Sequence, residues 1–224
     1  MIQSLLGAPI VSAVARESVV RDAANAVREL VVRTAIGSLV VSGGASTPVV
    51  LLHVAESWTS NQIPVIIVSD ERHTTDVREL NSEQLRTALH GTPLAAAHIV
   101  TTATSGDLLT SASEWSDQLA EIAPPSLALV SMADDGHVAS IFPMVDVEAV
   151  SDAVVVCRAS PKPPFERISL SMDYLRGLPH RFVVVIGREK SATLTAVARG
   201  ADLPISRLAP TCWFVESSLV PAER

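Results

Sequence analysis

The sequence predicts an α/β fold in which one mainly parallel, doubly wound β-sheet is flanked by helices. Short apolar runs alternate along the chain with helical patterns of about 10–20 residues, which is typical of βαβ units. Apolar residues make up 48% of the chain and aromatic residues only 4%. Such a core of Val, Leu, Ile and Ala suits buried parallel strands. Because 224 residues fit one domain of this class, we expect residues 1–224 to form a single domain.

The expected elements of the N-terminal half follow from hydrophobic spacing and from a proline, Pro48, near the start of a helix. In chain order they are a poorly specified strand or arm within residues 1–18, a helix over 17–36, a strand over 38–41, a helix from 47 to about 58, a strand over 63–68, a polar helix over 81–89 and a strand over 98–100.

The C-terminal half continues the same alternation. Its expected elements are a helix over 107–122, strands over 127–130, 153–157, 168–171 and 182–186, a helix over 188–199 and a last strand over 213–215. Between the strand at 127–130 and Pro143 we expect a polar loop that leads into a short apolar turn or helix.

Charge and cysteine content narrow the classes of partner. The formal net charge is −7 and the acidic residues are spread along the chain, which argues against a nucleic-acid partner. Cys157 and Cys212 match no metal or redox spacing, so we expect reduced thiols in a cytoplasmic protein. No apolar run reaches the ~18–20 residues that span a bilayer, and the N-terminus lacks the basic region of a signal peptide. We therefore expect no membrane partner. We expect a monomer or a homodimer.

Four polar loops follow predicted strands, at residues 42–47, 69–73, 131–137 and 187–190. Ligands of open α/β sheets bind outside the carboxyl ends of the strands. We therefore expect these loops to converge on one site. The scattered histidines His53, His90, His98 and His180 show no paired-ligand spacing, so no metal site is expected.

The first two of these loops offer groups that bind anions. Ser42-Gly43-Gly44 links a strand to a helix, where glycines allow close approach and N–H groups favour a phosphate. A tight turn with a Ser or Thr helix cap is the alternative. In the second loop, Arg72 could bind a phosphate and Asp70 could accept hydrogen bonds from sugar hydroxyls or move a proton. A solvated, salt-bridged turn would explain the same residues.

The third loop carries the candidate base. Histidine is the side chain best suited to exchange a proton near neutral pH, and His137 follows Asp134 and Asp135, either of which could fix its tautomer, so His137 could deprotonate a water. Gly136 would allow a conformation or a close approach that a Cβ forbids. A histidine that caps a helix is the competing interpretation.

Two further cations follow or begin late strands. Arg167 comes after a stiff proline run, and Lys190 lies near the first turn of a helix just past Gly187. Both could face one phosphate, Arg167 through a bidentate contact and Lys190 as a point charge. Simple solvation at the surface is the alternative for each.

Taken together, these motifs resemble those of the 6-phosphogluconolactonase family, in order and at similar intervals. They are Ser42-Gly43-Gly44 with Thr47-Pro48, Asp70-Glu71-Arg72 with Asn81, Asp135-Gly136-His137 with Ala139-Ser140-Ile141-Phe142-Pro143, Pro164 with Arg167-Ile168-Ser169-Leu170, and Val185 with Gly187, Glu189 and Lys190. The wider superfamily includes glucosamine-6-phosphate deaminase, which has a similar D-G-H loop. The D-E-R motif and the A-S-x-F-P run favour the lactonase.

The resemblance implies a Rossmann-like, sugar-phosphate-binding domain. It also implies hydrolysis of 6-phospho-D-glucono-1,5-lactone to 6-phospho-D-gluconate in the pentose phosphate pathway, with no metal or organic cofactor. By position, His137 would be the general base on water and Asp135 would orient it. The residues that would hold the phosphate and the sugar are Ser42, Gly43, Gly44, Asp70, Arg72, Arg167 and Lys190.

The chain departs from the family pattern at Ser131 and Ala133, where glycine is usual, and at Val138, where threonine is common. A Cβ at position 133 could shift the backbone that contacts the substrate. Two alternatives stay open. One is a sugar-phosphate isomerase or deaminase of the same superfamily, in which Asp70 would move protons. The other is a non-catalytic paralogue that binds a sugar phosphate.

Overall fold

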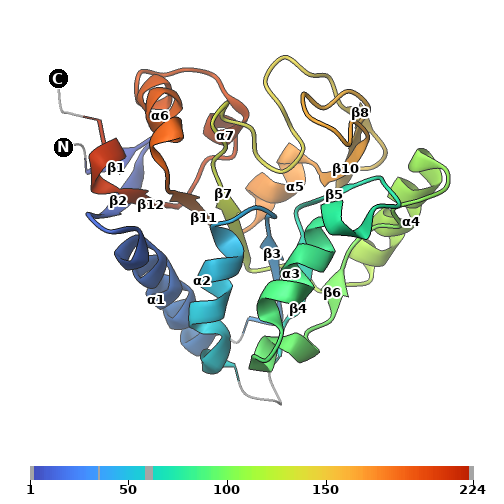
Figure 1. Cartoon of the computed structure of the whole chain (residues 1–224), viewed down its shortest axis with the longest axis horizontal. Helices are drawn as coiled ribbons and strands as arrows, with labels where there is room; N and C mark the ends of the chain where they lie inside the picture. Colours follow the sequence, from blue (N-terminus) through green and yellow to red (C-terminus); the bar gives the residue numbers. More distant parts are fainter. Residues whose placement is uncertain (1–2, 35, 59–62, 222–224) are drawn as a thin grey trace.

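The computed structural model describes residues 3–34, 36–58 and 63–221, which form two β-sheets surrounded by helices (Figure 1). The α-helices are α1 (Arg16–Thr34), α2 (Thr47–Val54), α3 (Asn81–Leu89), α4 (Leu108–Ala120), α5 (Met172–Gly177), α6 (Ser191–Ala198) and α7 (Pro204–Arg207). The strands are β1 (Ser4–Leu5), β2 (Ala8–Ala13), β3 (Ser38–Val41), β4 (Val65–Val68), β5 (Asp70–Arg72), β6 (Ile99–Val100), β7 (Leu127–Ser131), β8 (Glu148–Ala149), β9 (Val154–Cys157), β10 (Arg167–Leu170), β11 (His180–Val185) and β12 (Cys212–Glu216).

The larger sheet has eight strands in the order β1-β2-β12-β11-β7-β3-β4-β6. All its neighbouring pairs are parallel except the antiparallel pair β1–β2. This confirms the mainly parallel, doubly wound sheet predicted from the sequence. From the adjacent strands β3 and β7 the chain moves outward in opposite directions, to β4 and β6 on one side and to β11 and β12 on the other. The carboxyl ends of β3 and β7 therefore form a topological switch point, where such sheets bind ligands.

The central strands are mostly apolar and buried, as expected of strands whose sheet is covered by helices on both faces. All four residues of β3 are buried, as are residues 127–130 of β7. Helices α1, α2 and α3 pack side by side in one layer, and α1 directs its buried stripe, which includes Val20, Ala24 and Val27, toward β2, β11 and β12. Figure 1 shows α6 and α7 on the other side of the sheet. This arrangement gives continuous hydrophobic runs in the strands and amphipathic patterns in the helices.

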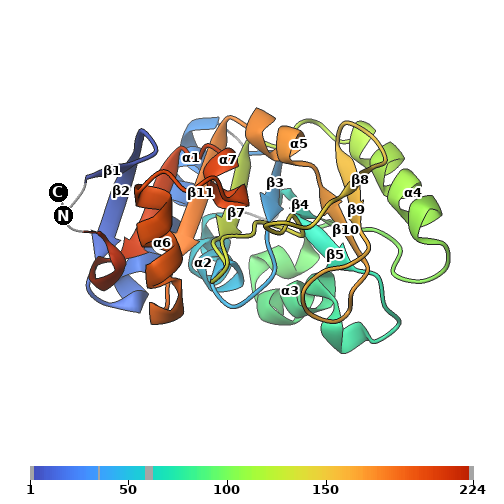
Figure 2. The same cartoon turned by 90° about the horizontal axis from the view of Figure 1, so that it is seen from above.

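The smaller sheet was not predicted. It is antiparallel, with four strands in the order β5-β10-β9-β8. The strands expected at 153–157 and 168–171 therefore do not join the parallel sheet; they correspond to β9 and β10 of this second one. Figure 2 shows the second sheet beside α4, which packs on β9. Only Ser69 separates β4 from β5, so the chain passes directly from one sheet into the other.

The second sheet has a register that matters for the site. Arg167 of β10 stands opposite Arg72 of β5, and Ile168 stands opposite Glu71. Two arginines that are distant in the sequence are thus held on neighbouring strands.

Some local predictions need correction. The helix expected over 47–58 ends at Val54 and continues as a 3-10 turn, and the helix expected over 188–199 begins as a 3-10 turn before α6. The apolar segment before Pro143, expected as a turn or a helix, is a turn, in which Val138 and Ile141 pair with each other. Among the described helices, none is both long and apolar enough to cross a membrane.

Candidate active site

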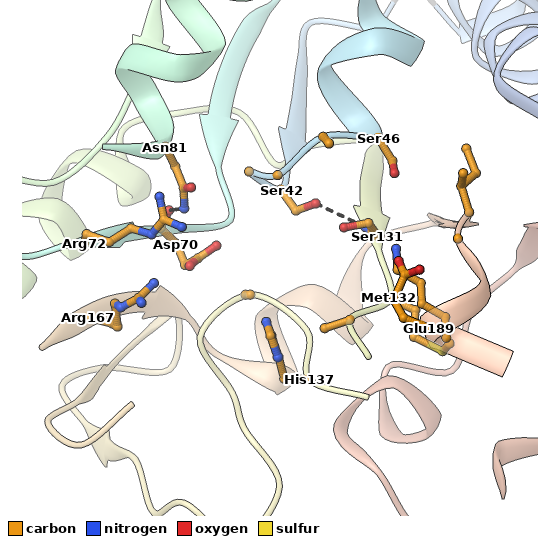
Figure 3. A pocket seen from close by; sticks show the side chains of 18 of the residues that line it. Ser42, Ser46, Asp70, Arg72, Asn81, Ser131, Met132, His137, Arg167 and Glu189 are labelled. Carbon is orange, nitrogen blue, oxygen red and sulfur yellow. Dashed lines mark hydrogen bonds between the residues drawn. The ribbon is translucent and has the colours of Figure 1, made fainter. Parts of the chain in front are cut away.

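A cavity of about 430 Å³ opens at the carboxyl ends of β3, β7 and β11, next to the second sheet. The predicted loops do converge here, because all of the predicted binding residues and His137 line the cavity (Figure 3). The lining residues are Arg16, Ser42, Gly43, Gly44, Ala45, Ser46, Asp70, Arg72, Asn81, Ser131, Met132, Ala133, His137, Ala139, Arg167, Ile186, Gly187, Glu189 and Lys190. Among the described residues, no three His, Cys, Asp or Glu side chains are grouped so that they could hold a metal ion.

The floor of the cavity lies at the topological switch point. Ser42, directly after β3, accepts a hydrogen bond on its Oγ from the backbone N–H of Ser131 at 3.1 Å (Figure 3). The Thr47 hydroxyl at the start of α2 donates to the carbonyl of Ser42 at 2.6 Å. These bonds fix the loop between β3 and α2, so that its N–H groups and the start of α2 border the cavity.

Gly43 in this loop is required by its neighbour. A Cβ built on Gly43 would lie 3.0 Å from Nδ2 of Asn81 and closer still to Oδ1. Asn81 is itself held in place, because its Nδ2 donates to the carbonyl of Asp70 at 2.8 Å. Gly43 thus permits close packing of this loop against Asn81, whereas the close approach to a ligand expected from the sequence stays a prediction.

Strand β5 divides its side chains between two tasks. Asp70 and Arg72 line the cavity, whereas Glu71 between them is fully buried on the opposite side, as the alternation of a strand requires. Glu71 accepts hydrogen bonds from the backbone N–H groups of Asn81 at 2.7 Å and Ser82 at 2.8 Å. Its carboxylate therefore caps the N-terminus of α3, where a negative charge is favoured.

The candidate base is held by one particular carboxylate. Nδ1 of His137 lies 2.6 Å from Oδ1 of Asp135, and the same oxygen accepts the backbone N–H of His137 at 2.9 Å. Asp134 differs in its contacts and not in its exposure, since both acids are exposed: the backbone carbonyl of Asp134 accepts a hydrogen bond from the hydroxyl of Thr193 in α6. The alternative that the sequence left open between the two acids is therefore decided by geometry in favour of Asp135 as the partner of His137.

The contact with His137 also sets the charge of Asp135. Partial burial raises the pKa of this carboxyl group, but hydrogen bonds from the side chain and the backbone of His137 outweigh burial, and the net pKa is lowered. Asp135 is therefore ionised at neutral pH and can accept a hydrogen bond from the N–H at Nδ1 of His137. The ring of His137 also lies against Phe142, with centroids 4.5 Å apart.

Gly136 meets both conditions predicted for it. Its φ is +83°, and an added Cβ would lie 2.8 Å from Cδ1 of Leu203. Its carbonyl accepts the backbone N–H of Ile205 in α7 at 3.0 Å. The loop that carries His137 is thus packed tightly against the segment around α7.

Two arginines give one side of the cavity a positive charge. Arg72 and Arg167 lie together there, across the cavity from the acidic residue Glu189 (Figure 3). Arg167 is 6% exposed, and its Nε donates to the carbonyl of Pro164 at 2.6 Å. Burial lowers the pKa of Arg167, and the charge of Arg72 lowers it further. This pair is a ready partner for a dianionic group.

Lys190 contributes a cation from the loop after β11. Burial lowers the pKa of Lys190, while the nearby acids Glu189 and Asp134 act in the opposite direction. Arg16, at the start of α1, also lines the cavity and lowers the pKa of Lys190 through its charge. The cavity is therefore suited to a negatively charged ligand.

Several lining residues were not predicted from the sequence, and among them Arg16 carries a positive charge. The signal that could have found it is the rule used for the other loops: Arg16 follows the carboxyl end of β2, which runs parallel to β12. The strand over 8–13 was too poorly defined by its residues for the rule to be applied.

A family model supports the resemblance seen in the motifs. Residues 12–215 match the model described as glucosamine-6-phosphate isomerases/6-phosphogluconolactonase. This match covers nearly the whole chain. The chain belongs to this family.

Individual relatives agree with the family model. A protein of Mycobacterium leprae named 6-phosphogluconolactonase is 32% identical over 147 residues, which is 59% of this chain and 60% of that protein. A rice protein (Oryza sativa subsp. indica), named probable 6-phosphogluconolactonase 2, is 34% identical over 105 residues, or 41% of this chain and 38% of the rice protein. The matches thus span less than two thirds of these relatives.

The crystal structure of 6-phosphogluconolactonase from Thermotoga maritima has the same fold. It superposes with a TM-score of 0.77 and 22% sequence identity, covering 93% of this chain and 98% of that one. The Rossmann-like α/β fold expected for the glucosamine-6-phosphate isomerase/6-phosphogluconolactonase family is therefore confirmed. The family description includes both isomerases and lactonases, so the choice between the two activities rests on the site.

Proposed function

We propose that this chain is a 6-phosphogluconolactonase, which hydrolyses 6-phospho-D-glucono-1,5-lactone to 6-phospho-D-gluconate in the pentose phosphate pathway. The observation that carries the proposal is the pair of His137 and Asp135, joined at 2.6 Å, in which His137 lines a cavity that is also lined by Arg72, Arg167 and Lys190, and Asp135 lies behind it outside the lining. The cavity thus combines a base for water with cations for a phosphate. The named relatives support the same activity.

The mechanism follows from the tautomer of His137. When Asp135 accepts the proton-bearing Nδ1, Nε2 is unprotonated and can take a proton from water. The resulting hydroxide attacks the lactone carbonyl and forms a tetrahedral intermediate. Collapse of that intermediate breaks the bond to the ring oxygen, which receives the proton from His137 as it leaves. A δ-lactone is a reactive ester, so no covalent nucleophile is needed.

The substrate would be held through its charge. We assign the phosphate to Arg72, Arg167 and Lys190 together with the loop of Ser42, Gly43 and Gly44, whose N–H groups precede α2. Nε and Nη2 of Arg167 donate to the carbonyls of Pro164 and Lys162, so Arg167 would meet the phosphate with its remaining N–H groups, and Lys190 would add a point charge. Positioning of the lactone beside His137 would supply much of the remaining acceleration.

An isomerase or deaminase is less well supported. In that chemistry Asp70 would move protons at a substrate carbon. Both carboxylate oxygens of Asp70, however, already accept hydroxyl hydrogen bonds, from Ser69 at 2.8 Å and from Ser140 at 2.7 Å. A carboxylate engaged on both oxygens is a poor proton shuttle, which favours the lactonase.

The domain organisation, the compartment and the oligomeric state are also part of the proposal. We infer one sugar-phosphate-binding domain that acts in the cytoplasm as a monomer or a homodimer. In support, all the residues that we assign to the phosphate line one cavity of a single chain, and Cys157 and Cys212 are both free thiols. Light scattering of the purified protein would give the oligomeric state.

The function is tested by following 6-phosphogluconate production from freshly made lactone, corrected for spontaneous hydrolysis. We expect the wild type to exceed the background rate and His137→Ala to lose about 10²–10⁴-fold in kcat, the usual contribution of a general base. His98→Ala is the matched control, because this exposed histidine does not line the cavity. A wild type no faster than the background would exclude the lactonase, and equal rates for wild type and His137→Ala would exclude the role of His137.

A further inference from the structure

Asp70 lines the cavity, but its carboxylate is turned to other parts of the protein. The side chain belongs to a residue that is only 5% exposed. Oδ1 accepts the hydroxyl of Ser69 at 2.8 Å, and Oδ2 accepts the hydroxyl of Ser140 at 2.7 Å. Ser69 is its chain neighbour, whereas Ser140 is 70 residues away, in the loop of His137. The bond to Ser140 therefore joins the His137 loop to the start of β5.

Ser140 lies in a tight turn that begins directly after His137. The N–H of Ile141 donates to the carbonyl of Val138 at 3.0 Å, and the N–H of Val138 donates to the carbonyl of Ile141 at 3.3 Å. Ala139, between them, has φ +51°. Such a turn is stiff. A restraint on Ser140 is therefore passed along the chain to the backbone of His137, three residues earlier.

A second contact fixes the same turn to the second sheet. The backbone N–H of Ser140 donates to Oγ of Ser169 in β10 at 3.2 Å. Ser140 is completely buried, and so is Ser169. Both contacts hold the turn against β5 and β10, the strands that carry Arg72 and Arg167.

The opposite end of the loop is held from the other half of the molecule. Thr193 in α6 donates its hydroxyl to the carbonyl of Asp134, and the N–H of Ile205 in α7 donates to the carbonyl of Gly136. His137 thus lies between two sets of restraints. Of these two sets, the one around Ser140 connects the His137 loop to β5 and β10, the strands that carry Arg72 and Arg167.

We propose that Asp70 and Ser140 are positioning residues for His137: their hydrogen bond sets the distance between the base and the arginine pair that holds the phosphate. The proposal rests on the proposed lactonase function for its catalytic consequence. In that reaction a base displaced by a fraction of an ångström from the attacking water loses rate, whereas phosphate binding is little affected. The pair should therefore act on kcat and not on KM.

The test compares Ser140→Ala with Ser116→Ala in the lactonase assay. Ser116 provides the matched control. It lies on α4, outside the cavity, and its hydroxyl donates to the hydroxyl of Ser151 at 2.7 Å. We expect Ser140→Ala to lower kcat about 10–100-fold with KM within about twofold of the wild type. Ser140→Cys, which keeps the size and a weak donor, should lose less. A folded Ser140→Ala with kcat within about twofold of wild type, or with a change in KM alone, would overturn the proposal.

A double-mutant cycle with Asp70→Ala separates positioning from general stability. If Ser140 acts through Asp70, Ser140→Ala should change kcat less than about twofold in the Asp70→Ala background. Equal losses in both backgrounds would show that Ser140 acts without Asp70.

A readout that does not need activity keeps this proposal distinct from the proposed function. Nuclear magnetic resonance can follow the imidazole nitrogens of His137 and the amide exchange of Val138 and Ile141. We expect both to change in Ser140→Ala and not in Ser116→Ala. If the wild type proves inactive on the lactone, these signals still decide: unchanged signals in Ser140→Ala refute the anchor, and changed signals support it.

Discussion

Replacing Gly43 by alanine should destabilise the protein because of one neighbour, Asn81. The added Cβ would lie 3.0 Å from Nδ2 of Asn81 and closer to Oδ1, which real Cβ atoms do not tolerate. Asn81 cannot turn away freely, since its backbone N–H is bound to Glu71 and its Nδ2 to the carbonyl of Asp70. Either the amide breaks its bond to Asp70 or the loop before α2 moves into the cavity.

The magnitude follows from these two costs. Overpacking in a closed site costs about 1–3 kcal/mol, and loss of one buried hydrogen bond adds about 1 kcal/mol. We expect Gly43→Ala to lower the free energy of unfolding by about 2–4 kcal/mol and to raise KM, because the loop borders the proposed phosphate site. Urea unfolding followed by circular dichroism measures the first, and the lactonase assay measures the second.

Two glycines serve as controls. Gly37 has no heavy atom within 4 Å of its added Cβ, so Gly37→Ala should change stability by less than about 0.5 kcal/mol. Gly44 is equally open but has φ +87°, so Gly44→Ala isolates the cost of backbone strain, about 1–2 kcal/mol. In an Asn81→Ala background, Gly43→Ala should cost less than about 1 kcal/mol. An undiminished cost there, or a Gly43→Ala as stable as the wild type, would refute the role given to Asn81.

Three further predictions concern charged residues. Arg167→Ala should raise KM about 10–100-fold and leave kcat largely unchanged, because a charge-assisted contact is worth about 1.5–3 kcal/mol; steady-state kinetics with unchanged KM would remove Arg167 from the site. Burial lowers the pKa of Lys190, so calorimetric binding of 6-phosphogluconate should weaken toward alkaline pH before an ordinary lysine would lose its proton. Lys190→Arg should keep its affinity there, and the same decline in both proteins would contradict this. Glu71→Ala should cost about 3–5 kcal/mol in urea unfolding, since it leaves the N–H groups of Asn81 and Ser82 without an acceptor, whereas exposed Glu83→Ala should cost less than about 1 kcal/mol.

The large sheet was predictable because its strands carry a local signal. The strand at 38–41 and the helix at 81–89 were placed with the bounds that the structure has, since β3 lies between Gly37 and the glycines of the next loop, and since α3 is followed by Gly91. The second sheet was missed for a physical reason. Its strand β5 consists of Asp70, Glu71 and Arg72, whose polar side chains give no strand pattern, and its pairing with β10 joins segments about a hundred residues apart.

Much of the cavity lining was predictable, because each residue expected to bind the ligand follows a predicted strand or begins one. The choice between Asp134 and Asp135 could not be predicted. The side chains of two adjacent loop residues point in different directions, and these directions depend on the contact of Asp134 with Thr193 and on the conformation of Gly136. The task of Glu71 was hidden for a similar reason: its partners are backbone N–H groups, which leave no trace in the sequence.

The register that sets Arg72 opposite Arg167 also affects the stability and the turnover of the protein. Like charges on paired positions of a sheet weaken the folded state, and burial of Arg167 adds to this cost. If the proposed phosphorylated ligand binds between the two arginines, it reduces this repulsion. Folding and binding would then be linked, and a ligand at a hundred times its Kd would add about 2.7 kcal/mol to the free energy of unfolding. The unfolded fraction, and with it degradation by proteases, should fall as the ligand accumulates. The abundance of this protein would then follow the supply of the metabolite that it binds.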